Sequence, residues 1–153
     1  MEPSFRVAEP ADADTLVEMM RDFNAHERIA FDEGEVRAVL AQLFADDSLG
    51  LACLVLLGEE VAGYVVIAFG FSVEFRGRDA FIDELFVKDE RRGRGLGAAA
   101  LRFAEGVCRT RGVRALHLEV ERENTRAQSV YRRAGFADHD RYLLTKWIVD
   151  SSQ

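Results

Sequence analysis

Apolar positions repeat along the chain with two different periods, and each period predicts one kind of element. Spacings of three and four residues, together with cap and stop signals, predict helices over residues 12–26, 35–44, 95–111 and 126–134. Runs rich in β-branched and aromatic residues predict strands over 5–8, 49–57, 61–71, 79–87, 115–120 and 142–148. The order is therefore β-α-α-β-β-β-α-β-α-β, which is typical of a mixed α/β domain built on one main sheet.

Length and composition narrow the class of protein. The chain has 153 residues, with 48% hydrophobic and 31% charged positions, and residues 1–153 contain no Pro/Gly/Ser-rich linker and no repeat. These values fit one globular domain and exclude a disulfide scaffold, a coiled coil or a disordered chain. We see no signal peptide and no apolar run of the roughly 18 residues that span a bilayer, so we expect no membrane partner.

The two cysteines indicate a reducing compartment. Cys53 and Cys108 both lie in apolar stretches, where a cysteine behaves as a small buried hydrophobic residue. We therefore expect a cytoplasmic protein whose chemistry uses neither thiol.

Charge is concentrated in one segment. The formal net charge is −7, yet residues 91–114 hold seven arginines and a single acid, Glu105. A short basic segment in an acidic protein favours one anionic ligand, whereas a nucleic acid would require a broadly basic face. We expect no nucleic-acid partner.

A glycine-rich turn connects the strand at 79–87 to the helix that follows it. Gly93, Gly95 and Gly97 alternate with other residues, so the backbone can approach a ligand without a clash from Cβ atoms. The free N–H groups and the dipole of the helix start favour an anion, and Arg92 and Arg94 add positive charge. The turn therefore predicts a cradle for a phosphate or a pyrophosphate.

Two better-known glycine loops do not fit this turn. A P-loop requires Lys and Ser or Thr after its glycines, whereas Leu96-Gly97-Ala98 stands here. A dinucleotide fingerprint requires a G-x-G-x-x-G spacing in a first βαβ unit, which this turn lacks.

A second group of residues follows the strand at 115–120. Asn124 is placed to cap the short helix, and Tyr131 lies about two helical turns further on, so both can face the same groove. Gly135 and Phe136 close the segment.

Together the two segments resemble the GNAT superfamily of acyl-CoA-dependent N-acetyltransferases. The Arg92-x-x-Gly95-x-Gly97 pattern is similar to its pyrophosphate motif, and the spacing of Asn124 and Tyr131 is similar to the segment with its catalytic tyrosine. The order of elements fits as well. The resemblance implies a single domain with a mixed, mostly antiparallel sheet flanked by helices.

The resemblance also implies acetyl-CoA as cosubstrate, without a metal. Its pyrophosphate would be bound by the loop and helix start, and its pantetheine arm by Asn124 and by the strand that precedes the loop. The implied binding residues are Leu85, Phe86, Val87, Arg92, Gly93, Arg94, Gly95, Leu96, Gly97, Ala98 and Asn124. His26, His117 and His139 show no metal-ligand spacing.

Two adjacent acids, Asp83 and Glu84, interrupt the apolar strand at 79–87. The strand more loosely resembles that of the diamine (spermidine/spermine) acetyltransferase branch, in which an acid pair occupies this place, although here the two acids come in the reverse order. Either acid could take the proton from an amine substrate, or both could bind a second cationic group. The resemblance implies that Tyr131 protonates the departing sulfur.

The acceptor is left open by the sequence. A small cationic amine such as a polyamine or an amino acid is one hypothesis, and a protein N-terminus or lysine is another. A third is a regulatory domain that binds acyl-CoA without catalysis. The apolar residues of the last predicted strand, Tyr142-Leu143-Leu144 and Trp147-Ile148, could pair across a homodimer.

Overall fold

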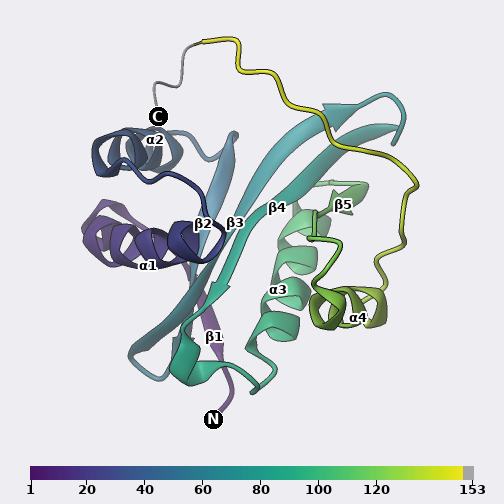
Figure 1. The fold of residues 1–153 in the computed structure, drawn as a ribbon. Helices are drawn as coiled ribbons and strands as arrows, with labels where there is room; N and C mark the ends of the chain where they lie inside the picture. The colour runs from purple at the N-terminus through teal and green to yellow at the C-terminus, as the bar shows by residue number, and fades with distance from the viewer. Residues whose placement is uncertain (150–153) are drawn as a thin grey trace.

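A five-stranded sheet with helices on both faces forms the body of the protein (Figure 1). The computed structural model describes residues 1–149. The strands are β1 (Ser4–Val7), β2 (Gly50–Leu57), β3 (Glu60–Ser72), β4 (Gly77–Val87) and β5 (Ala115–His117), in that order across the sheet. The first three pairs are antiparallel and β4 pairs with β5 in parallel, so the predicted mixed, mostly antiparallel sheet is confirmed.

Helices α1 (Ala13–His26) and α2 (Glu33–Ala45) cover one face of the sheet. The predicted apolar stripe of α1 explains this packing, because its residues Leu16, Met19 and Met20 are buried against Tyr64 and Val66 of β3. The other face carries α3 (Leu96–Thr110), whose Leu101, Ala104 and Cys108 are buried, and α4 (Thr125–Arg133). Short 3₁₀ turns, η1 (Pro10–Asp12) and η2 (Asp89–Arg91), precede α1 and α3.

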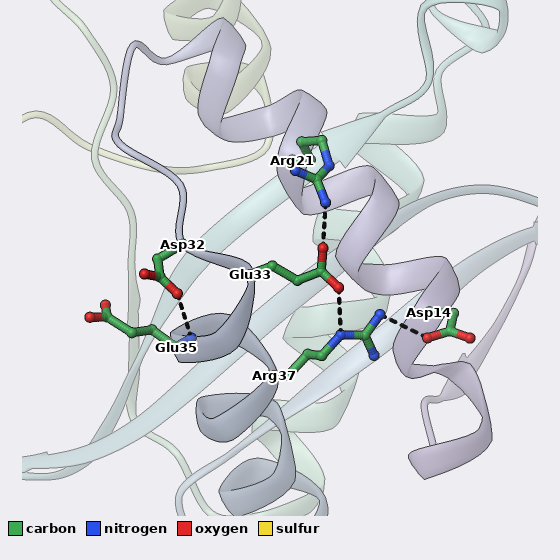
Figure 2. Close-up of polar contacts among 6 residues, drawn as sticks. All are labelled: Asp14, Arg21, Asp32, Glu33, Glu35 and Arg37. Atoms are coloured by element: carbon green, nitrogen blue, oxygen red, sulfur yellow. Dashed lines mark hydrogen bonds and ion pairs between the residues drawn. The ribbon is translucent and has the colours of Figure 1, made fainter.

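Charged side chains hold α1 and α2 together at the surface (Figure 2). Glu33 accepts hydrogen bonds from Arg21 and Arg37, at 2.7 and 2.9 Å, and Arg37 also pairs with Asp14 at 2.8 Å. Asp32 caps α2 by accepting from the Glu35 N–H at 3.0 Å, so the helix begins two residues before the predicted start. The network fixes the loop between the two helices, residues 27–32.

The strand predicted over 115–120 is shorter than expected. Pairing between β4 and β5 covers only Asp79–Phe81 against Ala115–His117. Directly after this stretch β4 contains an irregularity at Asp83, in its pairing with β3. Without a paired partner, residues 118–120 lie outside the sheet.

The strand predicted over 142–148 is wrong. These residues carry no regular secondary structure, and Tyr142, Leu144 and Ile148 are 83%, 89% and 88% exposed. The segment passes the end of the β3–β4 hairpin and continues toward α2 (Figure 1). Arg141 holds the segment there through two hydrogen bonds to Glu74, at 3.1 and 2.6 Å. Among residues 1–149 the segment therefore pairs with no strand, despite its high β propensity.

Candidate active site

The bulge in β4 decides where its two acids point. Val66 of β3 lies opposite Glu84 while Ile67 lies opposite Ile82, so Asp83 is the extra residue. In a regular strand, residues 82 and 84 would share a face. Here Ile82 packs beneath α3, whereas Glu84 turns to the α1 face, and Asp83 is exposed.

Glu84 is half-buried and has one hydrogen-bonding partner in the described chain. The Tyr64 hydroxyl donates to its Oε1 at 2.8 Å. The pKa of Glu84 is raised to about 6: burial raises it most, the Tyr64 hydrogen bond lowers it, and the charge of Asp83 raises it. Desolvation also raises the pKa of Asp83. A carboxylate with a pKa near 6 is suited to accept a proton at neutral pH.

The edge of β4 beyond the bulge faces a gap rather than a strand. Because the Lys88 N–H donates to the Ala62 carbonyl at 2.9 Å, the antiparallel alternation turns the main-chain groups of Leu85 and Val87 away from β3. β5 no longer pairs at this level. These groups can therefore extend the sheet to an amide-containing ligand, as predicted for Leu85 and Val87, while the Phe86 side chain is buried on the α1 face.

The glycine loop has the geometry of an anion cradle. Gly93 and Gly95 have φ values of +78° and +77°, which residues with a Cβ rarely adopt, and Gly95 caps α3. The first N–H groups of α3, from Leu96 onward, have no partner within the helix. Gly97 has an ordinary φ and a Cβ there would meet nothing within 4 Å, so the fold itself does not require glycine at this position.

The two arginines of the loop differ in their contacts. Arg92 pairs with Asp89 at 2.9 Å, donates to the Val87 carbonyl at 2.9 Å and lies over the ring of Phe86, 5.8 Å from its centroid. Arg94 is exposed beside the two positive-φ glycines. Arg92 therefore ties the loop to β4, whereas Arg94 presents its charge to the solvent side of the cradle.

The second predicted group lies on the far side of the gap. Asn124 caps α4, accepting from the Ala127 N–H at 3.1 Å, as the sequence predicted. Tyr131 is half-buried against Phe136, with ring centroids 6.3 Å apart. Burial raises the pKa of Tyr131, and the charge of Glu27 raises it further.

A cavity of about 720 Å³ lies between α1 and the end of β4. Glu18, Asp22 and His26 line it from one face of α1, and Phe86 and Lys88 line it from the opposite wall. Glu84 lies two residues before Phe86 on the same face of β4. The cavity therefore lies on the same side of the sheet as Glu84 and has a mostly acidic wall on the helix side.

Sequence reasoning missed two parts of this site. Tyr64 is the only residue with a polar side chain between Val61 and Phe69 of β3, and that isolation was the available signal. Glu18, Asp22 and His26 are spaced by four residues along α1, which places them on one helix face, but the pattern also fits an ordinary solvated face.

The remaining candidate side chains have structural surroundings. His117 Nε2 lies 3.2 Å from Asp79 Oδ2, and its ring packs against Phe75 and Phe81, as expected for a satisfied histidine. Cys53 and Cys108 are free and buried, and burial raises the pKa of the Cys53 thiol to about 11. Within residues 1–149 no group of three His, Cys, Asp or Glu side chains could hold a metal ion.

None of the helices in residues 1–149 combines the length and the hydrophobicity that crossing a lipid bilayer requires.

Comparison with known proteins gives a consistent result. The sequence model of the acetyltransferase (GNAT) family matches residues 16–136. Thialysine N-epsilon-acetyltransferase of Bos taurus is 32% identical over 81 residues, which are 53% of this chain and 47% of the bovine protein, so the match spans about half of that relative's length.

Solved structures share the fold over nearly the whole chain. Integron cassette protein HFX_CASS3, from the mobile metagenome of Cole Harbour Salt Marsh, is 35% identical with a TM-score of 0.84, covering 95% of this chain and 90% of its own. A predicted acetyltransferase from Clostridium acetobutylicum, solved with acetyl-CoA, is 19% identical with a TM-score of 0.79 and covers 95% and 96% of the two chains.

Proposed function

Because this chain belongs to the acetyltransferase (GNAT) family, a class of acyl-CoA N-acyltransferases, we propose that residues 1–153 act as one N-acetyltransferase domain. It transfers the acetyl group of acetyl-CoA directly to a primary amine of a small cationic molecule. The observation that carries the proposal is the build of β4, which joins a buried carboxylate, an open main-chain edge and a glycine cradle within 15 residues, 83–97.

The cradle and the open edge fit the two ends of acetyl-CoA. Its pyrophosphate is bound by backbone N–H groups of residues 92–98, with Arg94 adding charge, and its pantetheine amides pair with Leu85 and Val87. The Asn124 side-chain oxygen already caps α4, so the amide NH₂ is the part left to bind the pantetheine arm. The structure of the Clostridium protein with acetyl-CoA supports this cosubstrate through the shared fold.

Glu84 serves as the general base. A lysine-like amine has a solution pKa of about 10.4 and must lose a proton before it can attack the thioester. A carboxylate of pKa about 6 accepts that proton, directly or through a water molecule. Asp83 lies beside it, more exposed, and its charge favours a cationic acceptor over a neutral one.

Tyr131 serves as the general acid. The C–S bond breaks as the new C–N bond is completed, and the departing thiolate takes a proton or a hydrogen bond from the Tyr131 hydroxyl. Because burial and Glu27 both raise its pKa, Tyr131 holds its proton at neutral pH and is available as a donor. The amine attacks directly, so neither buried cysteine takes part.

The cavity beside α1 is the acceptor site. Glu18 and Asp22 give it a negative wall that a diamine or an amino-acid-like amine can approach with a positive group. The match to thialysine N-epsilon-acetyltransferase supports a small amine. Nucleic acid and membrane are not part of the proposal.

The test measures CoA release from acetyl-CoA with polyamines, free amino acids, aminoglycosides and short peptides as acceptors. We expect turnover with one class of small cationic amine. Turnover with peptides alone would show that the acceptor is a protein rather than a small amine. Tight acetyl-CoA binding without turnover would favour a regulatory acyl-CoA-binding domain, and failure to bind acetyl-CoA would contradict the assignment of the glycine loop.

We also propose that the protein is a homodimer held together by its apolar C-terminal segment. Tyr142, Leu144 and Ile148 are more than 80% exposed, which is unusual for so short a stretch of a monomer. Light scattering after gel filtration should give twice 17.2 kDa for the wild type and a monomer for Leu144→Asp. A monomeric wild type would contradict the proposal.

A cytoplasmic location completes the proposal. Its support is that Cys53 and Cys108 are both free thiols, as is usual in a reducing compartment. Fractionation of cells that express the protein at its native level tests the location, and recovery outside the cytoplasm would contradict it.

A further inference from the structure

We propose that Tyr64 is a positioning residue for the reaction: its buried hydroxyl holds the Glu84 carboxylate in the orientation that faces the acceptor amine. This inference rests on the proposed function, in which Glu84 is the base. Tyr64 itself touches no reacting atom, because it lies beneath Glu84 in the core between the sheet and α1.

The Tyr64 hydroxyl lies in the core, where its role is to donate a hydrogen bond to Glu84. The residue is 0% exposed and stands in an otherwise apolar stretch of β3. Burying a hydroxyl without a partner costs free energy, so a core position that needed only volume would be served by phenylalanine. The hydrogen bond to Glu84 Oε1, at 2.8 Å, is the partner that the structure supplies.

The ring of Tyr64 is held in place from two sides. Phe23 of α1 packs edge-on against it with centroids 6.4 Å apart, and Phe86 of β4 lies at 5.8 Å. These contacts restrict the movement of the ring, and Phe86 and the rest of the core remain when Phe23 is replaced. The hydroxyl therefore imposes one orientation on Glu84, rather than adapting to several.

The bulge at Asp83 makes this contact possible. Tyr64 lies opposite Phe86 and Val66 lies opposite Glu84, so Tyr64 and Glu84 are diagonal neighbours on the α1 face. With a regular β4, Glu84 would share the α3 face with Ile82 and could not reach the hydroxyl. The irregularity and the tyrosine thus act together, one turning the carboxylate and the other fixing it.

The contact also sets the charge state of the base. By donating to the carboxylate, Tyr64 favours its ionised form and opposes burial and Asp83, which favour the protonated form. The other titratable groups on this side line the cavity: Glu18, Asp22 and His26 from α1, and Lys88, Asp89, Glu90 and Arg92 from the opposite wall. None of these donates a hydrogen bond to Glu84 among the described residues.

Tyr64→Phe is the test, because it removes the donor and keeps the ring. We expect the acid limb of the kcat/KM profile to move from about pH 6 upward by about one unit, because a lost hydrogen bond to a carboxylate has roughly that effect. From this shift alone kcat should fall about threefold at pH 6.5 and approach a tenfold fall below pH 6, while KM for the amine changes little, because Tyr64 does not contact the acceptor.

Phe23→Leu is the matched control. It loosens the packing around the Tyr64 ring from α1 and leaves the hydroxyl in place. If Tyr64 only supports the core, both variants will lower Tm and neither will move the acid limb. If both variants move the limb equally, packing rather than the hydrogen bond is responsible, and the proposal is overturned.

A second measurement separates this inference from the proposed function. The Glu84 carboxyl is titrated by ¹³C NMR in the wild type and in Tyr64→Phe, without any substrate. A shift in both the NMR titration and the kinetic limb supports positioning. A shift in the NMR titration alone shows that Glu84 is not the base, which overturns the proposal together with that part of the function. No shift in the NMR titration overturns the positioning role by itself.

Discussion

The two edges of β4 are built in opposite ways. On the β3 side the pairing continues from Gly77 to Val87, interrupted only by the bulge at Asp83. On the β5 side it covers three residues, Asp79–Phe81, and then stops. One strand therefore has a closed edge that supports a carboxylate and an open edge that leaves main-chain groups free for a ligand.

The difference shows how a rigid element can hold a reactive group beside a binding gap. The closed side brings Tyr64 and Phe86 into the core around Glu84, so the proposed base has a fixed hydrogen-bonding partner and is partly desolvated. The open side keeps the main-chain groups of Leu85 and the N–H of Val87 available, since the Val87 carbonyl already accepts from Arg92, and it ends at the glycine loop. The bulge lies between the two, because it turns Glu84 toward the α1 face and comes directly after the last residue that pairs with β5.

Replacing the base should have the largest effect on this arrangement. Glu84→Gln keeps the size of the side chain and an oxygen for the Tyr64 hydroxyl, but it cannot take up a proton. We expect kcat to fall by about 10²–10⁴-fold. Asp83→Asn is the matched variant on the exposed neighbour and should cost less than about tenfold. If Asp83→Asn lowers kcat more than Glu84→Gln does, Asp83 is the base and the closed edge is a purely structural feature.

Removal of the general acid across the gap ranks second. Tyr131→Phe deletes the hydroxyl but keeps the ring packed against Phe136, so we expect a fall in kcat of about 10²-fold. An acetyl thioester with a more acidic thiol should reduce the loss, because its thiolate leaves without a proton. Tyr142→Phe, on an exposed ring, is the control. A loss that is the same with every donor would argue against the acid role.

Filling the glycine cradle should affect binding at the open edge more than chemistry. Gly97→Val should raise KM for acetyl-CoA about tenfold, because its side chain would occupy the space above the helix start while kcat changes little. Gly106→Val is the matched control in the same helix, where a Cβ also meets nothing within 4 Å. Equal effects of the two variants would mean that helix α3, rather than the cradle, was disturbed.

A substitution in the surface network between α1 and α2 should have the smallest effect, and it gives the baseline for the other variants. Arg37→Ala removes the pairs with Glu33 and Asp14, which are exposed, and should lower Tm by no more than about 2–4 °C. kcat/KM should not change. Thermal melts at low and high salt check this, because screening should narrow the difference between variant and wild type. A clear loss of activity would mean that the contact between α1 and α2 helps to position the wall of the acceptor site that α1 forms.

Local sequence signals predicted what depends on neighbouring residues. The apolar stripe of α1, the cap at Asn124 and the glycine turn before α3 all follow from residues within one or two turns of one another. The Tyr64–Glu84 contact joins residues 20 positions apart through a bulge, and no local pattern indicates it. The acids were visible in the sequence, but which face each would occupy was not.

The last predicted strand also shows the limit of local signals, because here a local pattern predicted an element that does not form. Residues 142–148 have the composition of a strand, yet a strand forms only where another offers a free edge in register. The ion pair between Arg141 and Glu74 carries the segment past the hairpin instead. Sequence by itself determined most of the elements, the family resemblance and the candidate residues for the chemistry, because periodicity, caps and motifs are local. Only the tertiary structure decided the break between β4 and β5, the face of Glu84 and the partner of its carboxylate, because these depend on how distant strands align.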